Sequence, residues 1–208
     1  HLYMEKFDEK TREELLSYIK AGTDDRIFAV AQLLRLGCNV QQIAFETKID
    51  GFFLEKMKKI IEMENMLKAN PWNRDVLHEA KRGGFSDRAV AWLWNTDEDT
   101  VFRIRKEMHL FPVYKMIDTC ASEFDSYVPY FYSTYEEENE SIAEDRKKIL
   151  VLGSGPIRIG QGVEFDYSTV HAVKTIRNAG YEAIVINNNP ETVSTDYTTS
   201  DKLYFEPL

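Results

Sequence analysis

Apolar residues recur at helical spacing through the first half of the chain. Between residues 24 and 37, Ile27, Val30, Ala31 and Leu34 follow the i, i+3, i+4, i+7 pattern of one buried helix face. Residues that favour helix N-termini precede such stretches, and glycine or proline follows them. The predicted starts are Thr11, Asp24, Asn39, Asp50, Asn73, Ser86 and Thr96, and the predicted stops are Gly22, Gly37, Pro71, Gly83, Gly84 and Pro112. Each amphipathic face needs a partner, so residues 1–112 are predicted to form an all-α helical domain.

The pattern changes after residue 147. The apolar run at 149–152 predicts a buried parallel strand over 148–152, and the spacing that follows predicts a helix from about 165 to 179, ended by Gly180. Further strands are predicted over 182–187 and from Leu203 onward. A β-α-β unit with a right-handed crossover is half of a doubly wound sheet, and a complete sheet needs more strands. The expected fold is therefore an all-α helical domain followed by an incomplete, truncated α/β Rossmann-like subdomain over 148–208.

The stretch between these regions, residues 113–147, is rich in aromatic and acidic residues. Phenylalanine and tyrosine crowd its middle, and residues 123–145 contain eight Asp or Glu and neither Lys nor Arg. Disordered segments are poor in aromatic residues, so we expect a connector whose rings pack onto their neighbours. Its acidity argues against a platform for stacking nucleic-acid bases.

Composition narrows the class of protein. The formal net charge is -9, whereas contacts to nucleic-acid phosphates require a basic surface. This charge argues against a general nucleic-acid binder. No apolar run approaches the roughly 20 residues that cross a bilayer, and the N-terminus has no signal-peptide core. Two cysteines, Cys38 and Cys120, are too few for a disulfide framework, so a cytoplasmic location is expected. The four histidines are scattered and give no metal-ligand spacing.

A weak internal repeat keeps a second function open. At an offset of 47 residues, two patterns of short helix, polar turn and longer helix follow each other, the second over 89–104. This is the outline of a helix-turn-helix, and Arg103, Arg105 and Lys106 lie in its second helix. The alternative is thus a DNA-binding regulator with a Rossmann-like sensor. The acidic residues 97–99 would face the DNA, however, so packed helical hairpins used for assembly are the favoured interpretation.

A glycine-rich loop joins the strand at 148–152 to the next helix. Its glycines are Gly153, Gly155, Gly160 and Gly162. A dinucleotide fingerprint fits poorly because the third glycine comes two residues late and the second strand ends in Asn187 instead of an acidic residue. A nicotinamide-dependent oxidoreductase is therefore disfavoured. A phosphate P-loop is rejected because no Gly-Lys-Ser/Thr follows. The preferred interpretation is a Rossmann-like turn that shapes a site for a small anion.

Polar residues accompany this loop. Arg158, Gln161, Glu164 and Asp166 lie on it, and the polar run 187–196 follows the next strand. In an open α/β sheet both segments lie at the carboxyl edge, where ligands bind. Asp166 also suits a helix cap, and the asparagines after the second strand also suit a turn.

Taken together, these motifs resemble one family. The segments GSGPIRIGQGVEFDYSTVHA (153–172), NNNPETVSTDY (187–197) and DKLYFEPL (201–208) resemble the large subunit of carbamoyl-phosphate synthetase at the opening of its second, carbamate-phosphorylating half. Upstream, DDRIFAVAQLLRLG (24–37), KIDGFFLEKMKKI (48–60), EAKRGGFSD (79–87), VYKMIDTCASEF (113–124) and FYSTYE (131–136) resemble that family's oligomerisation domain and connector.

The resemblance implies an ATP-dependent ligase that makes carbamoyl phosphate from bicarbonate, glutamine-derived ammonia and ATP, for arginine or pyrimidine biosynthesis. It implies self-association through the helical domain, a glutaminase small subunit or domain as partner, and ATP with Mg²⁺, possibly also K⁺, as cofactors of the parent enzyme. Residues 148–208 would be its pre-ATP-grasp subdomain. The residues that would line the carbamate site or tunnel are Arg158, Gln161, Glu164, Asp166, Asn188, Thr192 and Thr195. No ATP-grasp lysine, metal carboxylate or catalytic residue is recognisable, so the chain alone is expected to bind no cofactor and to be inactive.

Overall fold

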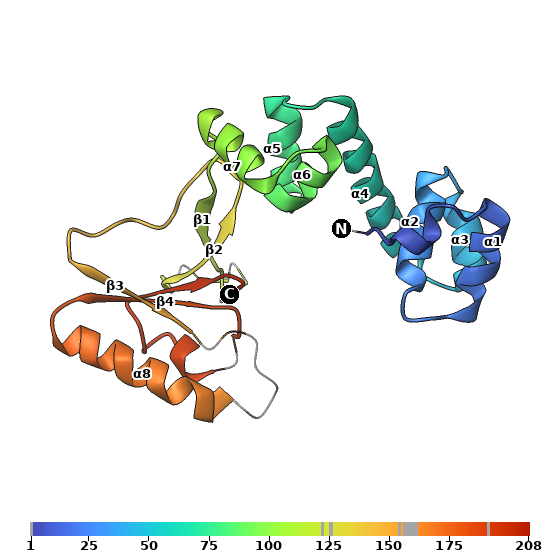
Figure 1. Ribbon diagram of the computed structural model, residues 1–208. Coiled ribbons are helices and arrows are strands. Elements are labelled where there is room, and N and C mark those ends of the chain that lie inside the picture. The colour runs from blue at the N-terminus through green and yellow to red at the C-terminus, as the bar shows by residue number, and fades with distance from the viewer. Residues whose placement is uncertain (1, 122, 125–126, 154, 156–161, 191) are drawn as a thin grey trace. The chain divides into compact units, whose positions relative to one another are not determined.

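The computed structural model describes residues 2–121, 123–124, 127–153, 155, 162–190 and 192–208, with the backbone alone for 162–165. The chain divides into two compact units, His1–Leu110 and Phe111–Leu208 (Figure 1). The first unit is helical, and the second is a sheet with a helix packed on it. The predicted fold class, a helical domain followed by an α/β subdomain, is confirmed. No described helix has the length and apolarity needed to cross a bilayer.

The helical unit consists of short helices joined by tight turns. Its elements are η1 (Glu5–Phe7), α1 (Arg12–Tyr18), η2 (Ile19–Ala21), α2 (Arg26–Arg35), α3 (Val40–Thr47), α4 (Gly51–Ala69), α5 (Arg74–Arg82), α6 (Asp87–Trp94) and α7 (Glu98–Glu107). The predicted caps Thr11, Asn39, Asp50, Asn73 and Ser86 each accept a hydrogen bond from a backbone N–H of the first turn. Capping of this kind satisfies donors that the helix itself leaves unpaired.

Two predicted helix starts are wrong by one residue. The N-cap of α7 is Asp97, not Thr96, because the Asp97 carboxylate accepts both the backbone N–H and the hydroxyl of Thr100, each at 2.8 Å. The residue before α2 is Asp25, not Asp24. Its carboxylate caps no helix, since it accepts the hydroxyl of Tyr18 at 2.8 Å instead. In both cases the second of two adjacent polar residues takes the position that the sequence assigns to the first.

The helical unit has two hydrophobic cores, and α4 contributes to both. Leu54 and Ile61 of α4 pack with residues of η1, η2 and α1–α3, whereas Leu67 packs with residues of α5–α7. Figure 1 shows α4 running from one group of helices to the other. Between these cores, Arg35 of α2 donates two guanidinium N–H groups to the buried Glu64 carboxylate of α4, at 2.9–3.0 Å. Because such a carboxylate loses its hydration, the pair fixes the α2–α4 packing more than it adds stability.

The second unit contains a five-stranded sheet in its described part. Its elements are β1 (Val113–Met116), β2 (Tyr130–Thr134), β3 (Lys148–Leu152), α8 (Gly162–Asn178), β4 (Glu182–Asn187), η3 (Val193–Thr195) and β5 (Lys202–Phe205). The strand order is β1-β2-β5-β4-β3, with β1 antiparallel to β2 and the other neighbours parallel. Helix α8 covers one face of β3 and β4, where Val173 packs with Ala183 and Val185 (Figure 1).

The predicted strands at 148–152 and 182–187 are confirmed, and β5 begins one residue before Leu203. Two differences stand out. Residues 113–147 supply β1 and β2. Phe131 of β2 is buried and stacks on the Tyr204 ring, with the ring centroids 5.3 Å apart. The prediction that 148–152 is buried is wrong: β3 forms the edge of the sheet, and Leu150 and Leu152 are exposed.

Candidate functional site

Strands β3, β4 and β5 run parallel, so their carboxyl ends meet at one edge of the sheet. The register that pairs Leu152 with Ile186 places the next residue of β3, Gly153, beside Asn187. The N–H of Gly153 donates to the Ile186 carbonyl at 2.8 Å. A Cβ at position 153 would lie 2.6 Å from Cγ of Asn187, which is closer than real side chains approach. Glycine is therefore required here because the Asn187 amide occupies the space.

Asn187 is fully buried at the end of β4. Its Oδ1 accepts the backbone N–H of Asn188 at 2.9 Å, which shapes the turn after the strand. Its Nδ2 has no hydrogen-bond partner in the part of the chain that the structure describes. A buried donor left unpaired costs about 1–3 kcal/mol, so this amide is a group that a ligand can satisfy.

Asp166 is the acidic counterpart of this amide. It lies in the second turn of α8, whose N-terminus is at the same carboxyl edge, and it is 1% exposed. Its Oδ2 accepts the backbone N–H of Ser194, which joins α8 to η3. Its Oδ1 has no hydrogen-bond partner among the described residues. The edge thus offers one buried N–H donor and one buried carboxylate oxygen, both uncommitted within the described structure.

Hydroxyl groups of the 192–195 turn support Asp166. Thr195 Oγ1 donates to the Thr192 carbonyl at 2.7 Å and accepts the Thr192 N–H at 3.3 Å, which closes the 3₁₀ turn around Ser194. From β2, the Tyr130 hydroxyl donates to the Thr195 carbonyl. Burial is the main cause that raises the pKa of Tyr130 above its ordinary value. Tyr130 thus remains a protonated donor well beyond neutral pH, and it holds the turn against the sheet.

The structure places some of the predicted site residues at this edge. Asp166, Thr192 and Thr195 come together through Ser194, and Asn188 follows β4 with its side chain exposed. Gly155 has a φ of 72°, which favours glycine, and Gly162 begins α8. Arg158, Gln161 and Gly160 lie outside the described residues, as does the side chain of Glu164.

Sequence reasoning missed three residues of the site. Asn187 enters the sequence analysis as evidence against a dinucleotide and as the first residue of the polar run 187–196, but not as a site residue, although a glycine in register with a polar strand end is the signal for close approach. Ser194 acts through its backbone N–H, which no side-chain pattern reveals. Tyr130 belongs to an aromatic stretch, and the sequence alone does not distinguish it from neighbouring rings that only pack. No three His, Cys, Asp or Glu side chains of the described residues form a metal-binding group.

Comparison with protein-family models matches both units. Residues 1–109 match the model for the carbamoyl-phosphate synthetase large chain, oligomerisation domain. Residues 145–208 match the model for the carbamoyl phosphate synthase preATP-grasp domain. The first match alone covers more than half of the 208 residues, and the two occur in the order that the sequence motifs indicated. The chain belongs to the carbamoyl-phosphate synthetase large-chain family.

Proposed function

We propose that this chain forms part of an ATP-dependent ligase that makes carbamoyl phosphate from bicarbonate, glutamine-derived ammonia and ATP. The helical unit mediates self-association, and the sheet unit contributes to the carbamate site or tunnel of the carbamate-phosphorylating half. The order of the two family matches supports this assignment. In this proposal ATP and Mg²⁺ bind elsewhere in the parent enzyme, and a glutaminase subunit or domain delivers ammonia. The cytoplasmic location remains a prediction from cysteine usage.

The pair of uncommitted polar atoms at the carboxyl edge carries the proposal for the sheet unit. Carbamate has an oxyanion at one end and N–H groups at the other. The buried Nδ2 of Asn187 suits the oxyanion, and the buried Oδ1 of Asp166 suits an N–H donor. A carboxylate at the second position also disfavours a ligand that carries negative charge at both ends. The edge therefore favours carbamate over an anion such as phosphate.

Solution NMR of the labelled chain tests this site. Ammonium and bicarbonate together form carbamate, whereas ammonium chloride or sodium bicarbonate alone does not. We expect the Asn187 side-chain amide signals to shift in a saturable manner only with the mixture. In Asn187→Ala, which has no side-chain amide to report, the backbone amides of residues 153 and 188 should not shift with the mixture, whereas in Asn178→Ala they should shift as in wild type. Equal shifts with either salt alone, or no saturable shift with the mixture, would contradict the site.

The chain by itself is proposed to lack catalysis. We expect no ATP- and bicarbonate-dependent formation of ADP by the purified chain. Turnover above the background of an inactive preparation would overturn this part of the proposal.

For self-association we assign a surface that we call the Phe patch: Phe45, Phe52 and Phe53. These side chains flank the turn between α3 and α4 and are 70%, 60% and 60% exposed. The Phe52 and Phe53 rings contact edge to face with centroids 5.4 Å apart. Exposed apolar patches with a polar rim mark protein-protein contacts, and the matched family model is named for oligomerisation. A second copy of the chain is therefore the proposed occupant.

Sedimentation of charged variants tests the Phe patch. We expect the wild-type chain to form dimers or larger species, and Phe52→Glu/Phe53→Glu to be monomeric at the same concentration. Phe102→Glu, at an exposed ring on α7, is the matched control and should assemble like wild type. A monomeric wild type, or assembly of the double variant, would contradict the assignment.

The helix-turn-helix alternative loses support from the contacts of α7. Arg105, one of the three basic residues of the second helix of that pattern, is buried and binds the Asp87 carboxylate and the Leu110 carbonyl. The N-terminal turn of α7 is acidic, with Asp97 as its cap. A recognition helix needs basic or polar groups at that turn.

A further inference from the structure

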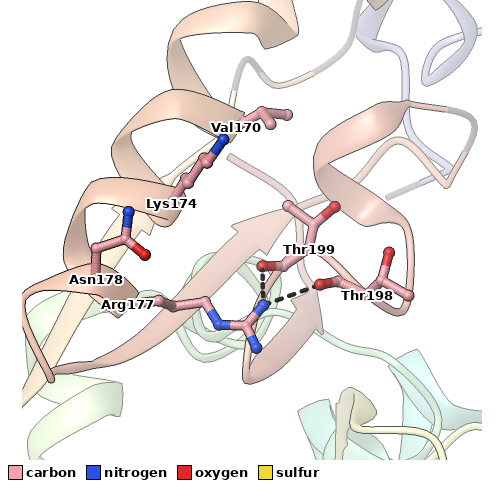
Figure 2. Close-up of a pocket in the computed structure, with 6 residues that line it drawn as sticks. All are labelled: Val170, Lys174, Arg177, Asn178, Thr198 and Thr199. Carbon is pink, nitrogen blue, oxygen red and sulfur yellow. Dashed lines mark hydrogen bonds between the residues drawn. The ribbon is translucent and has the colours of Figure 1, made fainter.

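A pocket of the sheet unit lies along α8, beginning one helical turn after Asp166. Its volume is about 460 Å³, and it lies between α8 and the segment before β5 (Figure 2). The lining residues are Val170, Lys174, Arg177 and Asn178 of α8 with Thr198 and Thr199. Helix α8 runs antiparallel to the strands, so its C-terminal half lies toward their amino ends. Neither Asp166 nor Asn187 is among the described lining residues of this pocket.

The spacing along α8 explains why these side chains face one opening. Positions 170, 174, 177 and 178 follow the i, i+4, i+7, i+8 rule and share one helix face. Val173, three residues after Val170 and four before Arg177, borders this face and is buried against the sheet. Lys174, Arg177 and Asn178 are exposed, so these polar residues of the pocket face lie outside the hydrophobic core.

Arg177 holds the far wall of the pocket in place. Its Nη1 donates to the carbonyls of Thr198 and Thr199, both at 2.9 Å, and Figure 2 shows the side chain reaching from the helix to this segment. The Thr199 hydroxyl donates away from it to the Val193 carbonyl at 2.9 Å. Carbonyl oxygens repel anions, but the two carbonyl oxygens on this wall already accept hydrogen bonds from the Arg177 guanidinium, which reduces that repulsion. Asp201, with Oδ1 3.7 Å from Arg177 Nε, offsets part of the Arg177 charge.

Lys174 is exposed and brings a positive charge that no described side chain pairs with. Its ammonium has neither an ion-pair nor a hydrogen-bond partner among the described residues, and the same holds for the Asn178 amide and the Thr198 hydroxyl. All three can donate hydrogen bonds, and together with Arg177 they border one opening. Uncompensated positive charge in a pocket is notable in a chain whose net charge is -9.

We propose that this pocket binds the oxyanion group, phosphate or carboxylate, of a small polar molecule. Lys174 provides the charge, and the Asn178 amide and Thr198 hydroxyl provide neutral donors. The volume is within the range of small-molecule sites and exceeds what one oxyanion fills, so the ligand carries an organic part. Among the described lining residues Val170 alone is apolar, which favours a polar ligand over a lipid or an aromatic drug-like molecule.

NMR titration of the full chain with simple anions tests the site and separates the two ligand chemistries. The probes are inorganic phosphate and acetate, added at constant ionic strength against sodium chloride. We expect saturable shifts of the backbone amides of residues 174–178 and 198–199 with one probe or both. A response to phosphate alone identifies a phosphorylated ligand, and a response to acetate alone identifies a carboxylate.

A charge-removing variant shows whether the response belongs to the pocket. Lys174→Gln should weaken binding by about tenfold, the effect of one charge-assisted hydrogen bond. Lys147→Gln, at an exposed lysine before β3, is the matched control and should bind like wild type. The proposal fails if neither probe saturates, if chloride gives the same shifts, or if Lys174→Gln binds as tightly as the control. Because carbamate is absent throughout, this result is independent of the carboxyl-edge site.

Discussion

Lys202 of β5 reaches diagonally to Glu182 of β4, with Lys202 Nζ 3.2 Å from Glu182 Oε1, while in the strand register Lys202 pairs with Ile184. The Glu182 carboxylate is fully buried, and Lys148 of β3 approaches its other oxygen to 3.4 Å. Neither Glu182 oxygen accepts a hydrogen bond among the described residues, and the two lysines donate instead to backbone carbonyls of the segment before β3, Lys202 to Ile142 and Lys148 to Arg146. One carboxylate and two ammonium groups thus join three strands and the segment before β3.

Removing one lysine from this cluster should destabilise the sheet unit. Lys202→Met keeps the side-chain volume but leaves the buried carboxylate with one partner, which costs about 3–5 kcal/mol. Hydrogen exchange measured by mass spectrometry should show faster exchange across β4 and unchanged exchange across α2. Lys147→Met should exchange like wild type.

Removing both charges together distinguishes the electrostatic contribution of the ion pair from the packing contribution of the two side chains. Lys202→Met/Glu182→Leu should cost less than Lys202→Met alone, because no uncompensated carboxylate remains in the core. If the double variant is the less stable of the two, the carboxylate does more than balance charge.

Asp87 is the buried carboxylate of the helical unit that corresponds to Glu182 of the sheet unit, because it also pairs with two cationic side chains. Its carboxylate binds Arg105 Nη2 at 3.0 Å and Lys81 Nζ at 2.9 Å, and all three side chains are largely buried. Asp87→Asn should lower the free energy of unfolding by about 3–5 kcal/mol because two cations lose their counter-charge. The chain's tryptophans all lie in this unit, at 72, 92 and 94, so urea denaturation followed by their fluorescence reports it selectively. Asp75→Asn, at an exposed carboxylate, should have little effect.

The same carboxylate predicts a pH dependence. Burial raises the pKa of Asp87, but hydrogen bonds from Arg105 and Lys81 outweigh it and hold the pKa below its ordinary value. Because the unfolded chain then binds a proton more readily, the stabilisation is complete above the ordinary pKa of about 4 and disappears as pH falls through the folded value. The stability difference between wild type and Asp87→Asn should shrink on acidification below about pH 4. A difference that stays constant down to acid unfolding would show that charge is not its source.

The close approach of Gly153 to Asn187 predicts a coupled pair of substitutions. Gly153→Ala should destabilise the sheet unit, because its Cβ would lie 2.6 Å from Asn187 Cγ. In an Asn187→Ala background the methyl group has room, so the added cost of Gly153→Ala should largely vanish. A double-mutant cycle monitored by exchange across β3 and β4 measures the coupling. Additive effects would mean that the asparagine side chain moves aside easily.

The sequence predicts most of the local structure because residues that favour helix ends stand at clear positions. Asn39, Asp50, Asn73 and Ser86 each precede an apolar face and each caps the helix that follows. Where two polar residues stand together, as at Thr96 and Asp97, local preference does not decide between them. There the second hydrogen bond, to the Thr100 hydroxyl, selects Asp97.

The site was harder to predict from the sequence than the helices, because it depends on contacts between residues that are distant in the sequence. The burial of Asn187, the link from Asp166 to Ser194 and the exposure of β3 all follow from the strand order, which one strand's pattern does not contain. An apolar run such as 149–152 predicts a strand, but it does not say whether that strand is central or at an edge. The lysine-bearing face of α8 resembles an ordinary solvated helix face until Thr198 and Thr199 are placed opposite it.

The position of β5 in the sheet has a consequence for how the chain folds. This strand is central, yet it comes last among the described elements, and Tyr130 of β2 meets its partner Leu203 only 73 positions later. Closing so long a loop is slow compared with forming contacts between successive helices. During synthesis on a ribosome, the helical unit is complete while β1 and β2 still lack their parallel neighbour. Assembly through the helical unit can therefore begin on a chain whose sheet has not yet formed.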